Sequence, residues 1–202
     1  FFHALNQKSI ARKAAKLLGK TYEEARLIVI HMGGGVSVAA HENGLAVDDF
    51  NVKDEGAFGM DRAGSLPVNA MINLCFSGLT KQEVKKRLGS EAGAYSYVGT
   101  KDFREVERRA FEEQDPECRM VFDAMAYQLA KDIGAMAAVL KFRVDAIVYT
   151  GGMAYSDRFT QAITDYVGNL APVIRLPGEE EMRSLAEGAL RVLHGEPAKV
   201  YP

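Results

Sequence analysis

The fold of this chain is decided by residues 27–38, LIVIHMGGGVSV, in which an apolar run leads into a His-Met pair and three consecutive glycines. The apolar run predicts a buried strand, and Val36–Val38 predicts the start of another, so the glycines are expected in a strand-to-strand turn. A turn without Cβ atoms can place its backbone N–H groups against a phosphate. A plain hairpin turn produces the same pattern. The spacing fits neither standard nucleotide fingerprint, because no Lys-Ser/Thr pair follows and the next segment indicates a strand rather than a helix.

The composition indicates a folded domain without the charge pattern of a nucleic-acid-binding protein. The chain has 202 residues, is 48% hydrophobic and carries a net charge of −2 with no basic run, which suits one large domain or two small ones and argues against a nucleic-acid partner. No apolar segment approaches the roughly 18 residues of a membrane span, and no charged leader precedes an apolar stretch. We therefore expect a cytoplasmic protein without a membrane partner. Cys75 and Cys118 are expected to be buried apolar side chains in a reducing compartment.

The chain opens with Phe1 instead of methionine and enters a helical pattern within a few residues. This start predicts a truncated piece of a longer protein, with part of the fold upstream. From there, apolar periodicity and turn residues predict the order of the elements. Helices are expected over residues 6–18, 67–78, from Thr80 onward, and over 102–113, 116–141, 156–167 and 179–193, and strands over 26–31, 36–41, 45–50, 145–150 and 172–176.

This order predicts an α/β fold with a ribonuclease-H-like mixed sheet, in which an antiparallel three-strand meander is followed by parallel strands and helices cover both faces. Residues 51–66 and 89–99 are expected to be loops. The helix over 67–78 is expected to bury its apolar residues Val68, Met71, Ile72 and Leu74. The stripe in the helix over 116–141 is expected to be core, and its members are Val121, Met125, Leu129, Ile133, Met136 and Leu140.

Two glycine turns are expected at one mouth of this sheet, because open α/β sheets bind ligands at the carboxyl ends of their strands. The turn at 33–35 suits a phosphate, and the pair Gly151-Gly152 suits a nucleoside, although close packing of helix on strand also explains that pair. His31 precedes the first turn, so its ring is expected to face the bound group; a purely structural histidine is the alternative. His41 is expected to face solvent.

Arg62 lies in an irregular loop, where a guanidinium can clamp a carboxylate or phosphoryl oxygen with two hydrogen bonds. A surface pair with Asp61 or Glu55 is the alternative. Residues 179–181 are three glutamates that open the last helix, where they either complement the helix dipole or contact Mg²⁺. Glycine turns, an arginine, a histidine and a carboxylate together point to phosphoryl transfer.

Several motifs occur in an order shared with a known family. They are His31–His41, Asp49–Asn51, Glu55–Phe58, Arg62–Pro67, Ala124–Gln128, Thr150–Ser156 and Pro177–Met182. In this order they resemble the butyrate kinase family over nearly the whole chain and, more distantly, the acetate kinases, whose glycine turn carries an asparagine where this chain has Gly34. The segment from Phe2 to Gln7 is similar to an acetate kinase segment whose first histidine lies near the transferred phosphoryl group.

The resemblance implies membership of the superfamily of acetate and sugar kinases, Hsp70 and actin, in which ATP lies between two lobes. It implies that residues 1–202 are the C-terminal nucleotide-binding lobe, that the N-terminal lobe is missing, and that this chain alone is inactive. The implied reaction is reversible phosphorylation of a short-chain carboxylic acid, butyrate, by ATP with Mg²⁺. Isobutyrate, propionate or acetate as substrate, or a lobe that binds nucleotide or dimerises without catalysis, are the alternatives. A homo-oligomer, dimer or higher, is also expected, with the helix over 116–141 as a possible contact.

The expected site follows from the same resemblance. Catalytic roles fall to Arg62, His31, His3 and Glu180, nucleotide contacts to Gly33, Gly34, Gly35, Ser37, Gly151, Gly152 and Met153, and metal contacts to Glu180 and Glu181. Arg62 is implied to stabilise the transition state.

Overall fold

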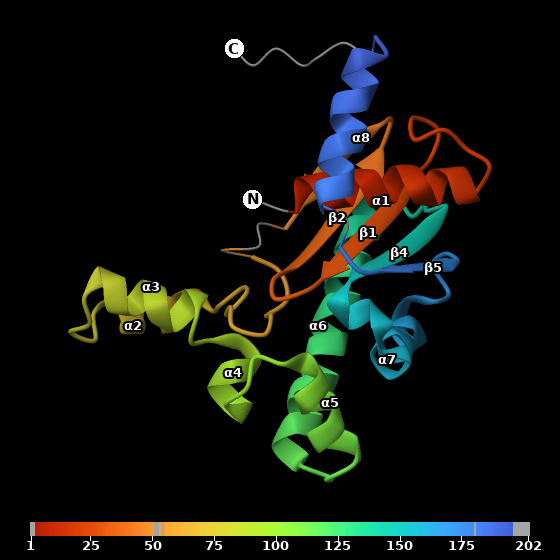
Figure 1. Cartoon of the computed structure of the whole chain (residues 1–202). Coiled ribbons are helices and arrows are strands. Elements are labelled where there is room, and N and C mark those ends of the chain that lie inside the picture. Colours follow the sequence, from red (N-terminus) through yellow and green to blue (C-terminus); the bar gives the residue numbers. More distant parts are fainter. Residues whose placement is uncertain (1–2, 51–52, 54, 180, 196–202) are drawn as a thin grey trace.

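The computed structural model describes residues 3–50, 53, 55–179 and 181–195, and it shows a five-stranded sheet between two layers of helices (Figure 1). The strands are β1 (Leu27–Met32), β2 (Val36–Glu42), β3 (Leu45–Asp49), β4 (Ala146–Gly151) and β5 (Val173–Pro177). Their order across the sheet is β3-β2-β1-β4-β5. The first three strands form an antiparallel meander, and β4 and β5 join β1 in parallel. The predicted α/β mixed sheet is therefore confirmed.

Several of the helices begin where the sequence supplies capping groups. Asp115 accepts hydrogen bonds from backbone N–H groups at the start of α6, Thr80 and Glu83 form a capping box on α3, and Ser156 caps α7. The helices are α1 (Ala4–Leu17), α2 (Val68–Cys75), α3 (Lys81–Gly89), α4 (Gly93–Val98), α5 (Phe103–Phe111), α6 (Pro116–Val139), α7 (Asp157–Val167), α8 (Glu181–Leu193) and the 3₁₀ helix η1 (Gly152–Tyr155). Helix α4 corrects the expected loop over 89–99, because Ala94 and Val98 are buried in the core that α6 covers.

Side chains of β1 alternate between two separate cores, because successive residues of a strand point to opposite faces of the sheet. Leu27 and Val29 pack under α1. Ile28, Ile30 and Met32 join the larger core on the other face, which α6 and α7 cover. Burial on both faces explains why the strand is an unbroken apolar run.

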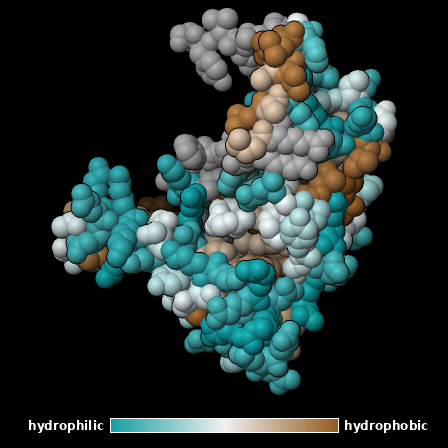
Figure 2. Space-filling model, in the orientation of Figure 1, coloured by the Kyte–Doolittle hydropathy of each residue, from teal (hydrophilic) through white to brown (hydrophobic). Residues whose placement is uncertain are grey.

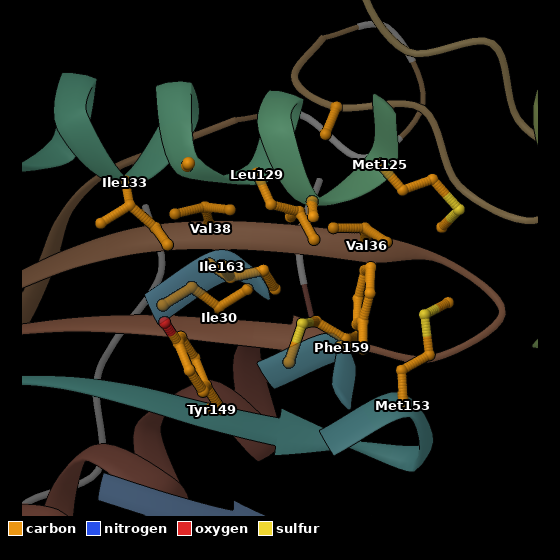
Figure 3. Packing of buried hydrophobic residues seen from close by; sticks show 14 of the residues in the cluster. Ile30, Val36, Val38, Met125, Leu129, Ile133, Tyr149, Met153, Phe159 and Ile163 are labelled. Atoms are coloured by element: carbon orange, nitrogen blue, oxygen red, sulfur yellow. The ribbon is translucent and has the colours of Figure 1, made fainter. Parts of the chain in front are cut away.

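The apolar stripe of α6 forms the centre of the larger core, as predicted. Figure 3 shows Leu129 and Ile133 lying over Val38 of β2, with Met125 at the end near Val36. All six residues of the predicted stripe are buried. Each such side chain stabilises the fold by about 1.5–3 kcal/mol relative to an exposed one.

Helices α2 and α3 project away from the sheet (Figure 1). No residue of α2 is buried, and the side chains of Val68 and Phe76 are 74% and 85% exposed. The expectation that the helix over 67–78 buries Val68, Met71, Ile72 and Leu74 is therefore wrong, as is the expected burial of Cys75, whereas Cys118 is buried as predicted. Helical spacing identifies an apolar side of a helix, but it does not say whether another element covers that side.

Helix α8 packs against α1 and also leaves apolar residues uncovered. Leu185, Leu190 and Leu193 are exposed, and Figure 2 shows hydrophobic residues along this helix at the top of the view. Among the described helices, none combines the length and the apolar character needed to cross a membrane.

Candidate functional site

A cavity of about 870 Å³ lies at the edge of the sheet where β1 and β4 end. Gly33 and Gly34 line it from the β1–β2 turn, and Gly152 and Met153 line it from the segment that follows β4. The two turns meet because β1 and β4 are parallel neighbours, so their carboxyl ends lie at the same edge. The structure thus brings both glycine turns to one cleft, as the sequence predicts.

The first turn is a three-residue connection that is closed by the pairing of Met32 with Val36. The N–H of Gly33 donates to the carbonyl of Gly35, whereas no hydrogen bond within the described part of the chain uses the N–H groups of Gly34 and Gly35. A Cβ atom on Gly33 would lie 2.8 Å from Oε1 of Glu179 and 3.0 Å from Nε2 of His31. Two unused N–H groups in a turn without side chains are suited to an anion such as a phosphate.

The two glycines of the second turn differ. Gly151 is buried at φ 88° and ψ 179°, and a Cβ atom there would lie 2.4 Å from the carbonyl oxygen of Met32. Gly152 is exposed on the cavity, with nothing within 4 Å of an added Cβ. Close packing, the alternative explanation, therefore accounts for Gly151, while Gly152 and Met153 are the residues that face the cleft.

His31 lies beside the cavity but is itself only 2% exposed. Its Nδ1 is 2.6 Å from Nδ2 of Asn6, its Nε2 is 3.3 Å from Oε1 of Glu179, and its ring centroid is 4.0 Å from that of His3. Burial, with a smaller contribution from His3, lowers the pKa of His31 to about 3. At neutral pH His31 is therefore an uncharged imidazole, which offers an N–H group and not a positive charge.

Ser37 does not line the cavity, although it is an expected nucleotide contact. It is opposite His31 in the β1–β2 ladder, is buried under α1, and its Oγ is 2.9 Å from Nδ1 of His3 and 3.0 Å from Nε2 of Gln7. His41, expected to face solvent, is fully buried on the same side of the sheet. That expectation is wrong because Gln7 of α1 and Tyr22, which follows that helix, lie against this face of β2 and are polar partners for the ring.

The loop that carries Arg62 is held by two side chains of α6. Asp132 accepts a hydrogen bond from the N–H of Ala57 at 2.6 Å, and Gln128 accepts one from the N–H of Phe58 at 3.1 Å. Burial raises the pKa of Asp132 to about 6. These two anchors fix the start of a segment that sequence patterns left irregular.

Arg62 itself is half-buried and does not line the cavity, although Met60 of the same loop does. Its loop lies against the first glycine turn, since a Cβ atom on Gly59 would be 3.4 Å from the carbonyl oxygen of Gly34. Asp61, one of its alternative partners, lies 3.3 Å from Lys101 instead. Within the described residues, no hydrogen bond or ion pair engages the Arg62 guanidinium.

The glutamates at 179–181 are only partly described. Glu179 lines the cavity next to His31. Glu180 lies outside the described residues, and so does the side chain of Glu181, the first residue of α8, so their expected metal contacts stay predictions. In the part of the chain that is described, no three His, Cys, Asp or Glu side chains form a group that could hold a metal ion.

Several residues that line the cavity were not predicted from the sequence. They are Lys101, Asp102, Phe103, Arg104, Glu107, Tyr155 and Ser156. The first five lie at or near the start of α5, where Asp102 caps the helix and its carboxylate binds the Arg104 guanidinium through both oxygens. The capping residue predicts that a helix starts there, but no local pattern indicates that this helix start reaches the end of β4.

Comparison with known sequences identifies the family. Residues 1–170 match the model of the acetokinase family. The chain is 47% identical to butyrate kinase 1 and 48% identical to butyrate kinase 2 of Clostridium acetobutylicum, over 203 aligned residues that include 99% of this chain and 57% of each relative. The chain thus spans little more than half the length of these relatives.

The fold agrees with this assignment. The crystal structure of acetate kinase from Porphyromonas gingivalis superimposes with a TM-score of 0.85 at 22% identity, covering 95% of this chain and 55% of that one. At this identity the likeness concerns the fold alone. On the match that extends over residues 1–170, the chain belongs to the acetokinase family.

Proposed function

We propose that the protein to which this chain belongs transfers the γ-phosphoryl group of ATP to a short-chain carboxylate such as butyrate. A carboxylate oxygen forms the new P–O bond, the bond between the γ-phosphorus and the β–γ bridging oxygen breaks, and ADP leaves with that oxygen. The products are an acyl phosphate and ADP, and the reaction is reversible. The nucleophile is already an anion, so no general base is needed.

The meeting of the two glycine turns on one cavity of about 870 Å³ carries this proposal. The size suits a nucleotide, since small-molecule sites are commonly about 300–1,000 Å³. We assign the phosphates to the turn at Gly33–Gly35. The N–H groups of Gly34 and Gly35 are unused there, and the turn has no side chains that would cover them. We assign the nucleoside to Gly152 and Met153, with the start of α5 as the opposite wall.

His31, His3 and Arg62 are the groups we assign to the transferred phosphoryl group. His31 is suited to donate a hydrogen bond to a phosphoryl oxygen without adding charge, because burial keeps it neutral. Arg62 would supply the positive charge, since its guanidinium has no partner among the described residues and its loop lies against the first glycine turn. Charge neutralisation and positioning carry most of the catalysis in phosphoryl transfer.

The residues of the cleft also fit Mg²⁺. This ion prefers oxygen ligands, keeps several waters, and is commonly held by one or two carboxylates together with substrate phosphates. Glu179 supplies one carboxylate at the cavity, next to the first glycine turn. When bound, Mg²⁺ neutralises part of the charge on the phosphates.

We propose that turnover requires the part of the relatives' length that this chain does not span, as a second lobe that closes over the cleft. The test combines this chain with the remaining segment of a butyrate kinase and measures hydroxamate formation from butyrate, ATP and hydroxylamine. Activity is expected from the combination and not from this chain alone. Acetate, propionate and isobutyrate in parallel reactions report the acid preference.

The alternative is a lobe that binds nucleotide or pairs with a second copy without contributing to catalysis. Binding of ADP with Mg²⁺ by this chain, measured by calorimetry, is expected under both proposals. Nucleotide binding without any hydroxamate in the combined sample would favour the alternative, and absence of nucleotide binding would contradict the proposed function and leave only a lobe that pairs with a second copy. The homo-oligomer stays a prediction, which sedimentation of the chain would check.

A further inference from the structure

A buried polar network lies between α1 and the sheet, beneath the two histidines of the proposed site. Asn6 and Gln7 are 1% and 0% exposed, and Ser37 and His41 are equally buried on β2. Most polar groups in such surroundings are hydrogen-bonded, with Oδ1 of Asn6 an exception among the described residues, and each bond needs one donor and one acceptor. The direction of each bond can therefore be worked out from the chemistry of the partners.

We propose that Asn6 and Gln7 are positioning residues that place the ring proton of both His31 and His3 on Nε2. The proposal rests on the proposed function in one respect only, namely that these two rings serve the transferred phosphoryl group. It concerns which nitrogen carries the proton, a property that is measurable without any reaction.

The bond from Asn6 determines the tautomer of His31. Nδ2 of Asn6 carries only donor hydrogens, so Nδ1 of His31, 2.6 Å away, must accept. A neutral imidazole that accepts at Nδ1 carries its proton on Nε2. That nitrogen is 3.3 Å from a carboxylate oxygen of Glu179 and 3.0 Å from the position of a Cβ atom on Gly33, so it lies beside the glycine turn. If the Asn6 amide were reversed, its Oδ1 would accept from a proton on Nδ1 of His31. Nε2 of His31 and the Glu179 carboxylate would then be two acceptors only 3.3 Å apart.

A longer relay determines the tautomer of His3. Nε2 of Gln7 donates to Oγ of Ser37 at 3.0 Å and to the carbonyl oxygens of Val29 and Ser37 at 3.2 Å. Among the described residues the other partner of this Oγ, Nε2 of Gln7, only donates, so the acceptor for the Ser37 hydroxyl hydrogen is Nδ1 of His3, 2.9 Å away. His3 then also carries its proton on Nε2.

The orientation of the Gln7 amide follows from the carbonyl oxygens of Val29 and Ser37, which only accept, and it bears on a third histidine. Its Oε1 lies 3.2 Å from Nε2 of His41, and Nδ1 of His41 lies 2.8 Å from the hydroxyl of Tyr22. Burial raises the pKa of Tyr22 to about 12 and lowers that of His41 to about 4, so the tyrosine keeps its hydrogen and the imidazole stays neutral. The relay is consistent with hydrogen bonds that all run one way, from Tyr22 through His41, Gln7 and Ser37 to His3.

Nitrogen-15 NMR of histidine-labelled protein tests the proposal, because the two ring nitrogens of each neutral tautomer have distinct shifts. In this chain at neutral pH, His3, His31 and His41 are each expected as the Nε2–H tautomer. A proton on Nδ1 of His31 or of His3 in the unaltered chain would overturn the proposal. No nucleotide or turnover is needed, so failure of the proposed reaction would leave this result unaffected.

Two near-isosteric variants separate positioning from mere packing. Asn6→Asp replaces the donor with a carboxylate that only accepts, so a proton is expected on Nδ1 of His31, with His3 unchanged. Ser37→Ala removes the relay, so His3 is expected to lose its single tautomer while His31 keeps its own. The control is Thr164→Val, which removes a partly buried hydroxyl bonded to Tyr149 and is expected to leave the histidine spectrum unchanged. A His31 ring that stays Nε2–H in Asn6→Asp, or a His3 ring unaffected by Ser37→Ala, would show that these side chains do not set the proton positions.

Discussion

Gly151→Ala is predicted to destabilise this fold strongly, whereas the same change at the next residue is predicted to be nearly neutral. Gly151 adopts φ 88° and ψ 179°, a backbone region that is essentially restricted to glycine. Forcing another residue into such a region costs on the order of 1–3 kcal/mol. The new methyl group would in addition lie 2.4 Å from the carbonyl oxygen of Met32, which the paired strands hold in place.

Relief of this overlap requires a shift of β1 against β4, and overpacking of that kind costs typically about 1–3 kcal/mol. We therefore expect the free energy of unfolding to fall by about 3 kcal/mol or more. For a chain of this size, 1 kcal/mol corresponds to roughly 2–4 °C in Tm, so Tm should fall by about 6–12 °C. Thermal and urea unfolding followed by far-UV circular dichroism measure both quantities.

Gly152→Ala is the matched control, because nothing lies within 4 Å of its added Cβ. Its unfolding free energy should change by no more than about 0.5 kcal/mol. The control variant should instead weaken binding of ADP, since the methyl group would project into the cavity. A Gly151→Ala protein as stable as its Gly152→Ala counterpart would refute the close approach of β4 to Met32.

Three further predictions concern pH, turnover and the arginine loop. The pKa values of His31 and His41 in the folded chain, about 3 and 4, lie below the ordinary value. The unfolded chain therefore binds more protons than the folded chain between about pH 6.5 and 4. The free energy of unfolding should fall as the pH drops through this range, by about 1.4 kcal/mol per pH unit for each ring. His41→Gln should remove the contribution of one ring, which urea titrations at pH 5 and 6.5 measure as a smaller change of the unfolding free energy with pH. An unchanged pH dependence would contradict burial of the neutral ring. The raised pKa of Asp132 changes the unfolding free energy in the opposite direction over this range. Arg62→Ala in the full-length protein should lower kcat by orders of magnitude with little change in ATP affinity, as for a contact made mainly in the transition state, and a modest loss in steady-state kinetics would contradict that role. Asp132→Ala should speed hydrogen exchange at the amide of Ala57 and lower stability by about 1–3 kcal/mol, because a partly buried N–H loses its acceptor; exchange as slow as in the unaltered chain would refute the anchor.

Apart from α4 and η1, the order of strands and helices was accessible from the sequence because its signals are local. Alternation and apolar runs mark β1 to β5, and capping residues such as Asp115 and Thr80 mark helix starts. The parallel crossovers follow from strands separated by helices, so the mixed sheet and the meeting of the two glycine turns at one edge could be predicted without coordinates.

Errors arose where a local pattern needed a distant partner to be interpreted. The apolar side of α2 has the same spacing as that of α6, yet only α6 has a sheet beneath it. His41 lies in a polar hairpin sequence, and only the placement of α1 across the sheet buries it. Periodicity records which side chains share a face, and coverage of that face depends on packing between elements far apart in the chain.

The sequence by itself determined the fold class and two glycine turns with a histidine beside the first, because these features depend on residues that are neighbours in the sequence. Only the tertiary structure decided that Gly151 serves packing while Gly152 faces the cavity, that α5 supplies a wall of the cleft, and that Asn6 and Gln7 lie beneath His31 and His3. The physical reason is that a close approach, a buried hydrogen bond or a shared cavity is a relation between residues tens of positions apart. Such a relation exists only once the chain has packed.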